Sequence, residues 1–125
     1  METLKGHNVI REKAMLFSVR VSHLNEYLIG KRKYTLADQV FRSGTSIGAN
    51  LSEAKRAESK SDFVHKYSIA LKEAEETLYW LELAFRTNLL DEKLYKSLYN
   101  DCEELIRLGT SISLTMLRKI KAEKN

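Results

Sequence analysis

The chain contains no proline and only five glycines among its 125 residues, so very few positions can stop a helix. Those positions group at three places and divide the chain into four segments. We expect the four helices to begin near capping residues, which are Asn8 for the first, Thr35 for the second, Ser59 or Ser61 for the third and Asp91 for the fourth. We expect the first helix to end at Gly30, the second near residue 58 and the third at a turn formed by residues 88–90. No segment shows the alternating pattern of a β-strand.

Apolar residues recur at helical spacing along these segments. The first segment carries them at a 4-3-4-3-4 spacing, at Ile10, Ala14, Phe17, Val21, Leu24 and Leu28. A repeat near 3.5 residues favours helices that cross at about 20°, and connections of about three to five residues force successive helices to run antiparallel. The sequence therefore predicts an all-α fold, an antiparallel up-down-up-down four-helix bundle. We expect residues 1–125 to form one domain, with the first few and last several residues extended or flexible.

The segment from Arg42 to Ala54 places small and polar residues between the apolar positions. Gly44 and Gly48 lie four residues apart, so on a helix they share one face and let another backbone approach closely. Each glycine costs a helix about 1 kcal/mol relative to alanine, which indicates a compensating contact. Asn50 and Glu53 lie one turn apart, and this spacing predicts a shared polar contact to a neighbouring helix or to the adjoining connection. For this pair we favour packing over ligand binding.

The same segment carries a family resemblance. Residues 39–42 (Gln-Val-Phe-Arg) and 46–54 (Ser-Ile-Gly-Ala-Asn-Leu-Ser-Glu-Ala) resemble the signature of the four helix bundle protein family, the 23S rRNA intervening-sequence proteins. The likeness continues through Asp62-Phe63, Tyr67, 69–71, 73–75 and 89–90, over residues 9–117. Gly48 stands where many relatives have proline, and Ala54 where many have glycine. The residues that the resemblance marks as motif and packing positions are Arg42, Gly44, Ser46, Gly48, Asn50 and Glu53.

The resemblance also carries expectations about assembly and partners. It implies a homopentamer, a ring of five bundles. It further implies kinship with the accessory variability protein of diversity-generating retroelements, which binds nucleic acid and a reverse transcriptase. The activity of most family members is unknown, so the family informs the fold more than the function.

Basic residues gather at one end of the predicted bundle, where the amino terminus, the second connection and the carboxyl terminus meet: Lys5, Arg11, Lys13, Lys55, Arg56, Lys60, Lys66, Arg118, Lys119, Lys121 and Lys124. The formal net charge is +4. A basic end repeated around a ring favours backbone-directed binding of RNA or DNA, with Lys55, Arg56, Lys60, Arg118, Lys119 and Lys121 as the candidate nucleic-acid contacts. The alternative is that cations near helix carboxyl ends only stabilise the helix dipoles. Aromatic residues do not interleave with the basic ones, so we expect no stacking of bases.

The sequence offers no recognisable catalytic or metal site. Di-iron bundles need paired Glu-x-x-His elements, whereas Asp62 and His65 form a single acid and histidine pair. Cys102, the only cysteine, falls on the apolar stripe of the fourth helix, which predicts a buried structural thiol. We therefore expect no enzyme activity, no cofactor and no bound metal.

Large apolar residues beyond the core seam of the third helix predict the oligomer interface, at Tyr79, Trp80, Leu83 and Phe85. The leading interpretation is a non-enzymatic, homo-oligomeric helical scaffold that binds RNA or DNA through backbone electrostatics. The alternative is a protein-only adaptor that docks a partner through exposed apolar surface and binds no nucleic acid. The amino-terminal sequence lacks the apolar core of a secretory signal and no apolar run spans a membrane, so we expect a cytoplasmic protein without membrane attachment.

Overall fold

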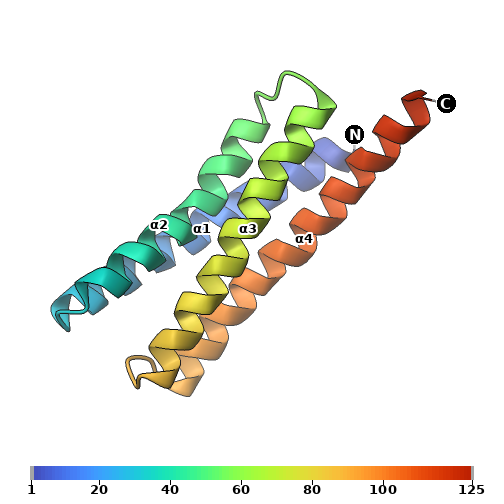
Figure 1. The fold of residues 1–125 in the computed structure, drawn as a ribbon. Helices are drawn as coiled ribbons and strands as arrows, with labels where there is room; N and C mark the ends of the chain where they lie inside the picture. Colours follow the sequence, from blue (N-terminus) through green and yellow to red (C-terminus); the bar gives the residue numbers. More distant parts are fainter. Residues whose placement is uncertain (1, 125) are drawn as a thin grey trace.

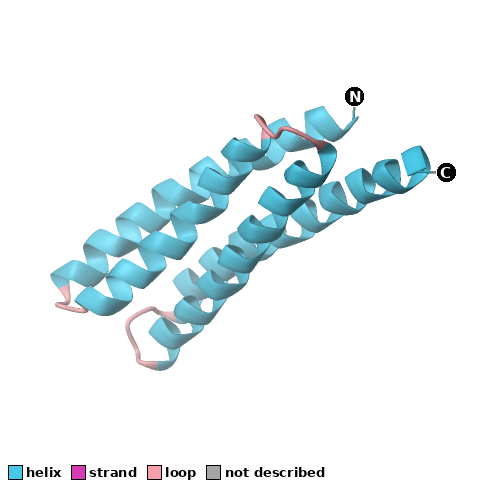
Figure 2. Ribbon diagram, turned by 45° about the horizontal axis from the view of Figure 1, so that its top comes forward, coloured by secondary structure: helices cyan, strands magenta, loops and turns pink. Residues whose placement is uncertain are grey.

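The computed structural model describes residues 2–124 of the chain, with side chains from residue 4 onward. Four helices follow one another, α1 (Glu2–Gly30), α2 (Tyr34–Ala54), α3 (Lys60–Arg86) and α4 (Glu92–Lys124). Short loops join them, and the described residues contain no strand (Figure 2). Each helix packs against two others, α1 and α3 both against α2 and α4, and successive helices run in opposite directions (Figure 1). The predicted antiparallel four-helix bundle is confirmed.

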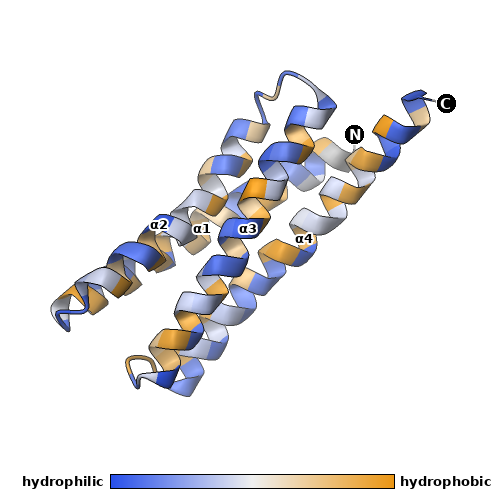
Figure 3. Ribbon diagram, viewed as in Figure 1, coloured by the Kyte–Doolittle hydropathy of each residue, from blue (hydrophilic) through white to orange (hydrophobic). Residues whose placement is uncertain are grey.

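The core is built from the predicted apolar seams. All six seam positions of α1 from Ile10 to Leu28 are buried, as is Tyr67 of α3. Figure 3 shows apolar residues recurring along every helix between polar ones. The loop between α3 and α4 also contributes to the core, because Leu90 is buried there.

The first two helices differ in length from the prediction. α1 begins at Glu2, so Asn8 is not a cap but an exposed residue inside the helix. The buried stripe extends back to His7, and this packing keeps the residues before Asn8 helical instead of extended. α2 ends at Ala54 and not near residue 58, and Lys33 precedes it in place of the expected Thr35 cap. The carboxyl-terminal residues are helical through Lys124, whereas Met1 and Asn125 lie outside the described residues.

The other two helices begin as expected. The Ser59 hydroxyl accepts a hydrogen bond from the Asp62 backbone N–H at 3.0 Å and caps α3. The Asp91 carboxylate accepts one from the Leu94 N–H at 2.7 Å and caps α4. A side-chain oxygen at the first position outside a helix satisfies amide groups that have no partner within it.

Two residues with positive φ shape the turns at the opposite end of the bundle, Arg32 (61°) and Asn88 (63°). The Lys33 N–H donates to the Leu28 carbonyl and the Arg32 N–H donates to the Ile29 carbonyl, which is the pattern of a Schellman motif. Asn88 forms the corresponding pattern after α3. Gly30 is the last residue of α1, as expected, and the left-handed residue of the turn is Arg32, two positions further on.

The predicted close approach at the glycine pair is confirmed, and the partner is α1. A Cβ atom added at Gly44 would lie 2.8 and 2.9 Å from the two methyl groups of Val21. A Cβ atom added at Gly48 would lie 3.5 Å from the Ala14 Cβ, which is an ordinary contact. Gly44 thus permits the spacing between α1 and α2, and Gly48 is less restrictive.

Candidate nucleic-acid interface

Four segments meet at the basic end of the bundle: the start of α1, the loop after α2, the start of α3 and the end of α4 (Figure 1). They line an open pocket of about 330 Å³, here named the lysine pocket. Its lining combines three lysines with apolar, histidine and serine side chains: Lys55, Lys60, Lys119, Leu4, Ala54, Ala57, Phe63, Met116, His7 and Ser59. None of these lining residues is acidic. Three of the six cations predicted from the sequence therefore face one pocket.

The other three predicted cations lie elsewhere. Arg56 lines a separate depression with Lys66 and three acids, Glu53, Glu58 and Asp62. Arg118 lines another depression on α4, together with Arg107. Lys121 is exposed in the last turn of α4 and lines neither of these depressions nor the lysine pocket.

One lysine of the pocket is not explained by the helix dipole. Lys55 follows the carboxyl end of α2 and Lys119 lies near that of α4, where positive charge is favourable. Lys60 is the first residue of α3, where the dipole disfavours a cation. It pairs with Glu123 of α4, and both side chains are largely exposed. Exposed ion pairs contribute only about 0–1 kcal/mol, so this pair leaves Lys60 able to exchange partners.

An aromatic cluster of the buried His7 and Tyr67 and the partly buried Phe63 adjoins the pocket. Phe63 stacks on Tyr67 with ring centroids 4.6 Å apart, and the His7 ring lies 5.4 Å from Phe63. His7 is 1% exposed, and its Nδ1 is hydrogen-bonded to the Tyr67 hydroxyl at 2.5 Å. Within the described part of the chain, its Nε2 has no hydrogen-bond partner. Burial, followed by the charges of Arg11 and Lys55, lowers the pKa of His7 and favours the neutral ring.

Sequence reasoning missed this cluster beside the lysines. Phe63 and Lys60 are one turn apart, but Lys119 and His7 come from opposite ends of the chain. The resemblance covers Phe63 and Tyr67 without giving them a role. One feature of the sequence could have indicated the cluster. His7 lies three residues before Ile10, so it continues the buried seam of α1 beyond the expected start of that helix.

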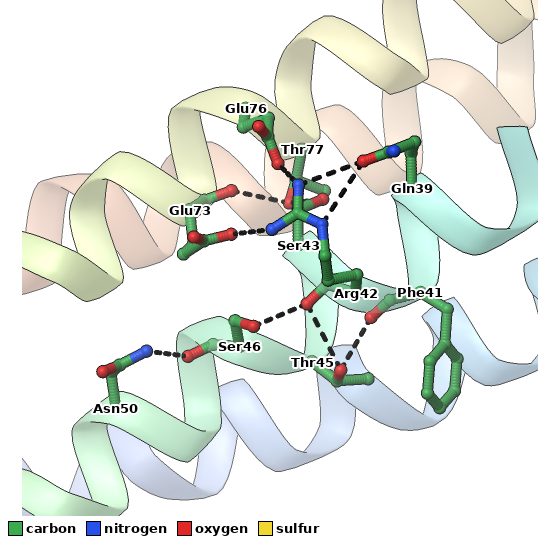
Figure 4. A network of polar contacts seen from close by, with 10 residues as sticks. All are labelled: Gln39, Phe41, Arg42, Ser43, Thr45, Ser46, Asn50, Glu73, Glu76 and Thr77. Carbon is green, nitrogen blue, oxygen red and sulfur yellow. Dashed lines mark hydrogen bonds and ion pairs between the residues drawn. The ribbon is translucent and has the colours of Figure 1, made fainter. Parts of the chain in front are cut away.

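The motif residues form a polar contact between α2 and α3 (Figure 4). The Arg42 guanidinium bonds to the Glu73 carboxylate at 3.1 Å and also to Glu76. Beneath it, the buried Ser43 and Thr77 hydroxyls are hydrogen-bonded at 2.9 Å. These contacts join two helices, so they support a packing role for the motif.

The remaining polar motif residues act locally. The Ser46 hydroxyl donates to the Arg42 carbonyl and the Asn50 amide donates to the Ser46 carbonyl, both within α2 (Figure 4). Glu53 instead pairs with Lys66 of α3 at 3.0 Å, a hydrogen bond that raises the pKa of Lys66. Asn50 and Glu53 therefore do not share a partner, contrary to the prediction.

The predicted oligomer residues divide into two pairs. Tyr79 (63% exposed) and Leu83 remain accessible on α3. Trp80 is partly buried against the core, and Phe85 stacks on Tyr95 of α4 at 4.4 Å. The last two residues therefore contribute mainly to packing within the protomer.

A second exposed apolar surface lies on α1, where Met15 (59% exposed), Leu16 (58%) and Val19 are accessible. These residues lie outside the core seam, so the spacing of the seam does not mark them. Met15 and Leu16 are adjacent, and Val19 follows them by four and three residues, which places all three on the outward side of the helix.

Cys102 is fully buried, as predicted, and its Sγ donates to the Ala74 carbonyl at 3.3 Å. Burial raises the pKa of this thiol to about 12, so it is protonated at neutral pH. Among the described residues, no group of three histidine, cysteine or acidic side chains could hold a metal ion. None of the helices in the described range has the combined length and apolar character needed to cross a bilayer.

The fold and the lysine pocket define an all-helical bundle protein with one basic end. The model of the 23S rRNA-intervening sequence protein family matches residues 7–111, and the chain belongs to that family. It is also similar to the crystal structure of a protein with unknown function from the S23 ribosomal protein family of Bacteroides thetaiotaomicron, with 45% identity and a TM-score of 0.84. The match covers 86% of this chain and 97% of that chain. A comparison with proteins of curated function found no match.

Proposed function

We propose that this protein is a non-enzymatic, homo-oligomeric scaffold that binds RNA or DNA through the phosphates of the backbone. The observation that carries the proposal is the arrangement of Lys55, Lys60 and Lys119 around one pocket whose lining contains no acid. Three ammonium groups can contact successive phosphates, and each neutralised phosphate releases counterions. The position of Lys60 at a helix amino terminus supports ligand binding over stabilisation of helix ends.

The assembly we propose is the pentamer that the family resemblance implies, closed by contacts between unlike faces. A ring needs two different complementary surfaces on each protomer. The chain offers Tyr79 and Leu83 on α3, and Met15, Leu16 and Val19 on α1. The helices α1 and α3 do not contact each other in the bundle, so these surfaces lie on different sides. Kinship with the retroelement accessory protein remains part of this proposal and rests on the resemblance.

Nucleic-acid binding is tested by titrating structured RNA, single-stranded RNA and duplex DNA at low and physiological salt. The variant Lys55→Gln/Lys60→Gln/Lys119→Gln should bind duplex DNA more weakly. The slope of the logarithm of the binding constant against the logarithm of the salt concentration should become shallower. Each lost phosphate contact reduces it by about 0.9, so three lysines reduce it by about 2.7 for each protomer that contacts the duplex.

A matched control removes three exposed lysines from the opposite end, Lys31, Lys33 and Lys93. It leaves Arg32 intact because that residue holds the left-handed turn. This control has the same net charge as the pocket variant, and it should bind nucleic acid as the wild-type protein does. Equal loss in both variants would show that net charge, and not the lysine pocket, attracts the nucleic acid.

The assembly is tested by light scattering on Leu16→Glu and Tyr79→Glu. Each variant places a charge in one of the two apolar surfaces and should reduce the mass in solution to that of a monomer. A mixture of the two should form dimers, because each retains the face that the other has lost. Dimers formed by either variant alone would contradict contacts between unlike faces.

A protein-only adaptor is the second candidate, and exposed apolar residues outside the two proposed ring faces favour it. Leu114 and Leu117 are both about half exposed on α4. A partner protein that docked there would make the basic end a solvated surface only. Absence of nucleic-acid retention at low salt by an intact oligomer would favour this candidate.

A further inference from the structure

The lysine pocket brings together two kinds of side chain that the sequence keeps apart. Its wall includes the Phe63 ring, which is backed by Tyr67 at 4.6 Å. Its remaining lining includes Lys55, Lys60 and Lys119, from three different segments. An aromatic ring beside lysines is the combination with which proteins hold single-stranded nucleic acid, because every base has a face that can stack.

Building on the proposed function, we propose that the lysine pocket receives one unpaired nucleobase of a single-stranded nucleic acid. The base lies against Phe63, and the flanking phosphates contact Lys55, Lys60 and Lys119. Bases within a duplex are stacked on both faces and cannot enter. The proposed ligand is therefore a single strand, bulge or loop, which replaces the expectation of purely backbone-directed binding.

The size and lining of the pocket fit this occupant. A volume of about 330 Å³ is near the lower end of the range for small-molecule sites, roughly 300–1,000 Å³. Its apolar side chains, among them Ala54, Ala57 and Met116, offer a dry surface to a flat ring. No acid lines the pocket, and the carboxylate that pairs with Lys60, that of Glu123, is exposed outside the lining, so phosphates attached to that ring can take its place.

His7 also lines the pocket, and one of its ring nitrogens has an unfilled hydrogen-bonding position. Its Nδ1 is engaged by Tyr67, whereas Nε2 is buried and has no hydrogen-bond partner among the described residues. Leaving a buried polar atom unpaired is unfavourable, so a ligand that reaches Nε2 once the side chains covering it shift gains a hydrogen bond. The edge of a nucleobase carries both donors and acceptors and can pair with either tautomer of the ring.

The experiment compares two ligands with the same number of phosphates. Fluorescence anisotropy measures the affinity for a short oligothymidine and for an abasic oligonucleotide of equal length. Loss of one stacked base weakens binding about 5- to 150-fold, so the wild-type protein should prefer oligothymidine by that factor. Phe63→Leu should lose the preference while keeping its affinity for the abasic strand and for duplex DNA. Phe63→Tyr retains the ring and should retain the preference.

Phe41→Leu is the matched control. Phe41 is an exposed aromatic residue of α2, about 20 Å along the helix from Ala54, and its loss should leave the preference unchanged. Circular dichroism during urea unfolding verifies that Phe63→Leu is folded under the binding conditions. Should that variant be unfolded, His7→Gln replaces it, with loss of the preference again expected.

The outcomes separate this inference from the proposed function. Equal wild-type affinity for both ligands would overturn the base pocket and leave phosphate binding intact. A preference that survives in Phe63→Leu would also overturn it, because the base would then lie elsewhere. Failure of the wild-type protein to bind any of the nucleic acids would overturn both proposals.

Discussion

Replacing the two glycines of α2 by alanine should have effects of opposite sign. At Gly44 the new methyl group would lie 2.8 and 2.9 Å from the Val21 methyl groups and 3.3 Å from its Cβ. At Gly48 the nearest atom is the Ala14 Cβ at 3.5 Å. Only the first substitution therefore requires α1 and α2 to move apart.

The magnitudes follow from two competing contributions. Alanine improves helix propensity by about 1 kcal/mol at either site. Overpacking costs about 1–3 kcal/mol, and the upper part of that range applies at Gly44 because valine is stiff about χ1 and presents both methyl groups. We expect Gly44→Ala to lower the free energy of unfolding by about 1–2 kcal/mol, and Gly48→Ala to raise it by up to about 1 kcal/mol.

The assay is urea unfolding followed by far-UV circular dichroism, at one protein concentration because assembly contributes to stability. Val21→Ala combined with Gly44→Ala should be less destabilised than the sum of the single variants, by about 1–3 kcal/mol. A Gly44→Ala protein as stable as wild type would refute the argument that this glycine sets the helix spacing. A double variant whose loss of unfolding free energy equals the sum of the two single losses would also refute it.

Three further predictions concern buried polar groups. Because the pKa of His7 is lowered in the folded protein, the unfolded chain takes up a proton at a higher pH than the folded protein does. The contribution of the neutral His7 ring to folding stability is therefore fully present above about pH 6.5 and is lost as the pH falls toward the pKa in the folded state. Urea unfolding of His7→Gln should lose that acid-side decrease, whereas the exposed control His65→Gln should keep it. Cys102 should resist thiol reagents in the native protein and react on unfolding, as measured by absorbance of the released thiolate of the reagent. Thr77→Val should lower the free energy of unfolding by about 1–3 kcal/mol, because it leaves the Ser43 hydroxyl without its partner.

Much of the fold follows from local features of the sequence. The apolar seam from Ile10 to Leu28 and the capping pair Ser59 and Asp62 each depend on neighbours within one helix, and the structure confirms both. Prediction failed where tertiary packing decides the outcome. The sequence around Asn8 does not show that α1 begins earlier, whereas in the structure His7 packs against Tyr67, which is 60 residues away in the sequence.

The same limit applies to the candidate site. Antiparallel topology was enough to place Lys55, Lys60 and Lys119 at one end, but the lysine pocket depends on side chains from α1, α3 and α4. Interleaving along the sequence therefore cannot detect aromatic and basic residues that the fold brings together from different segments. The helix ends, which are the least certain part of a sequence-based prediction, decide whether such a pocket exists.

Unequal helix lengths explain why the pocket lies at the basic end. Short loops align α1 with α2 and α3 with α4 at the opposite end. Because α1 has 29 residues and α2 has 21, α1 extends about 12 Å beyond α2, at 1.5 Å per residue. Likewise α4 extends about 9 Å beyond α3, with 33 residues against 27.

The overhanging turns of α1 and α4 extend beyond the end of α2, so α2 does not cover their inner faces. Leu4 and His7 belong to the overhang of α1, and Met116 and Lys119 lie where the overhang of α4 begins. The loop after Ala54 crosses this space without filling it. Helices of equal length, as the sequence predicted for the first pair, would close the end with packed side chains. The basic end can therefore offer a ligand both charge and an apolar recess because α2 stops early.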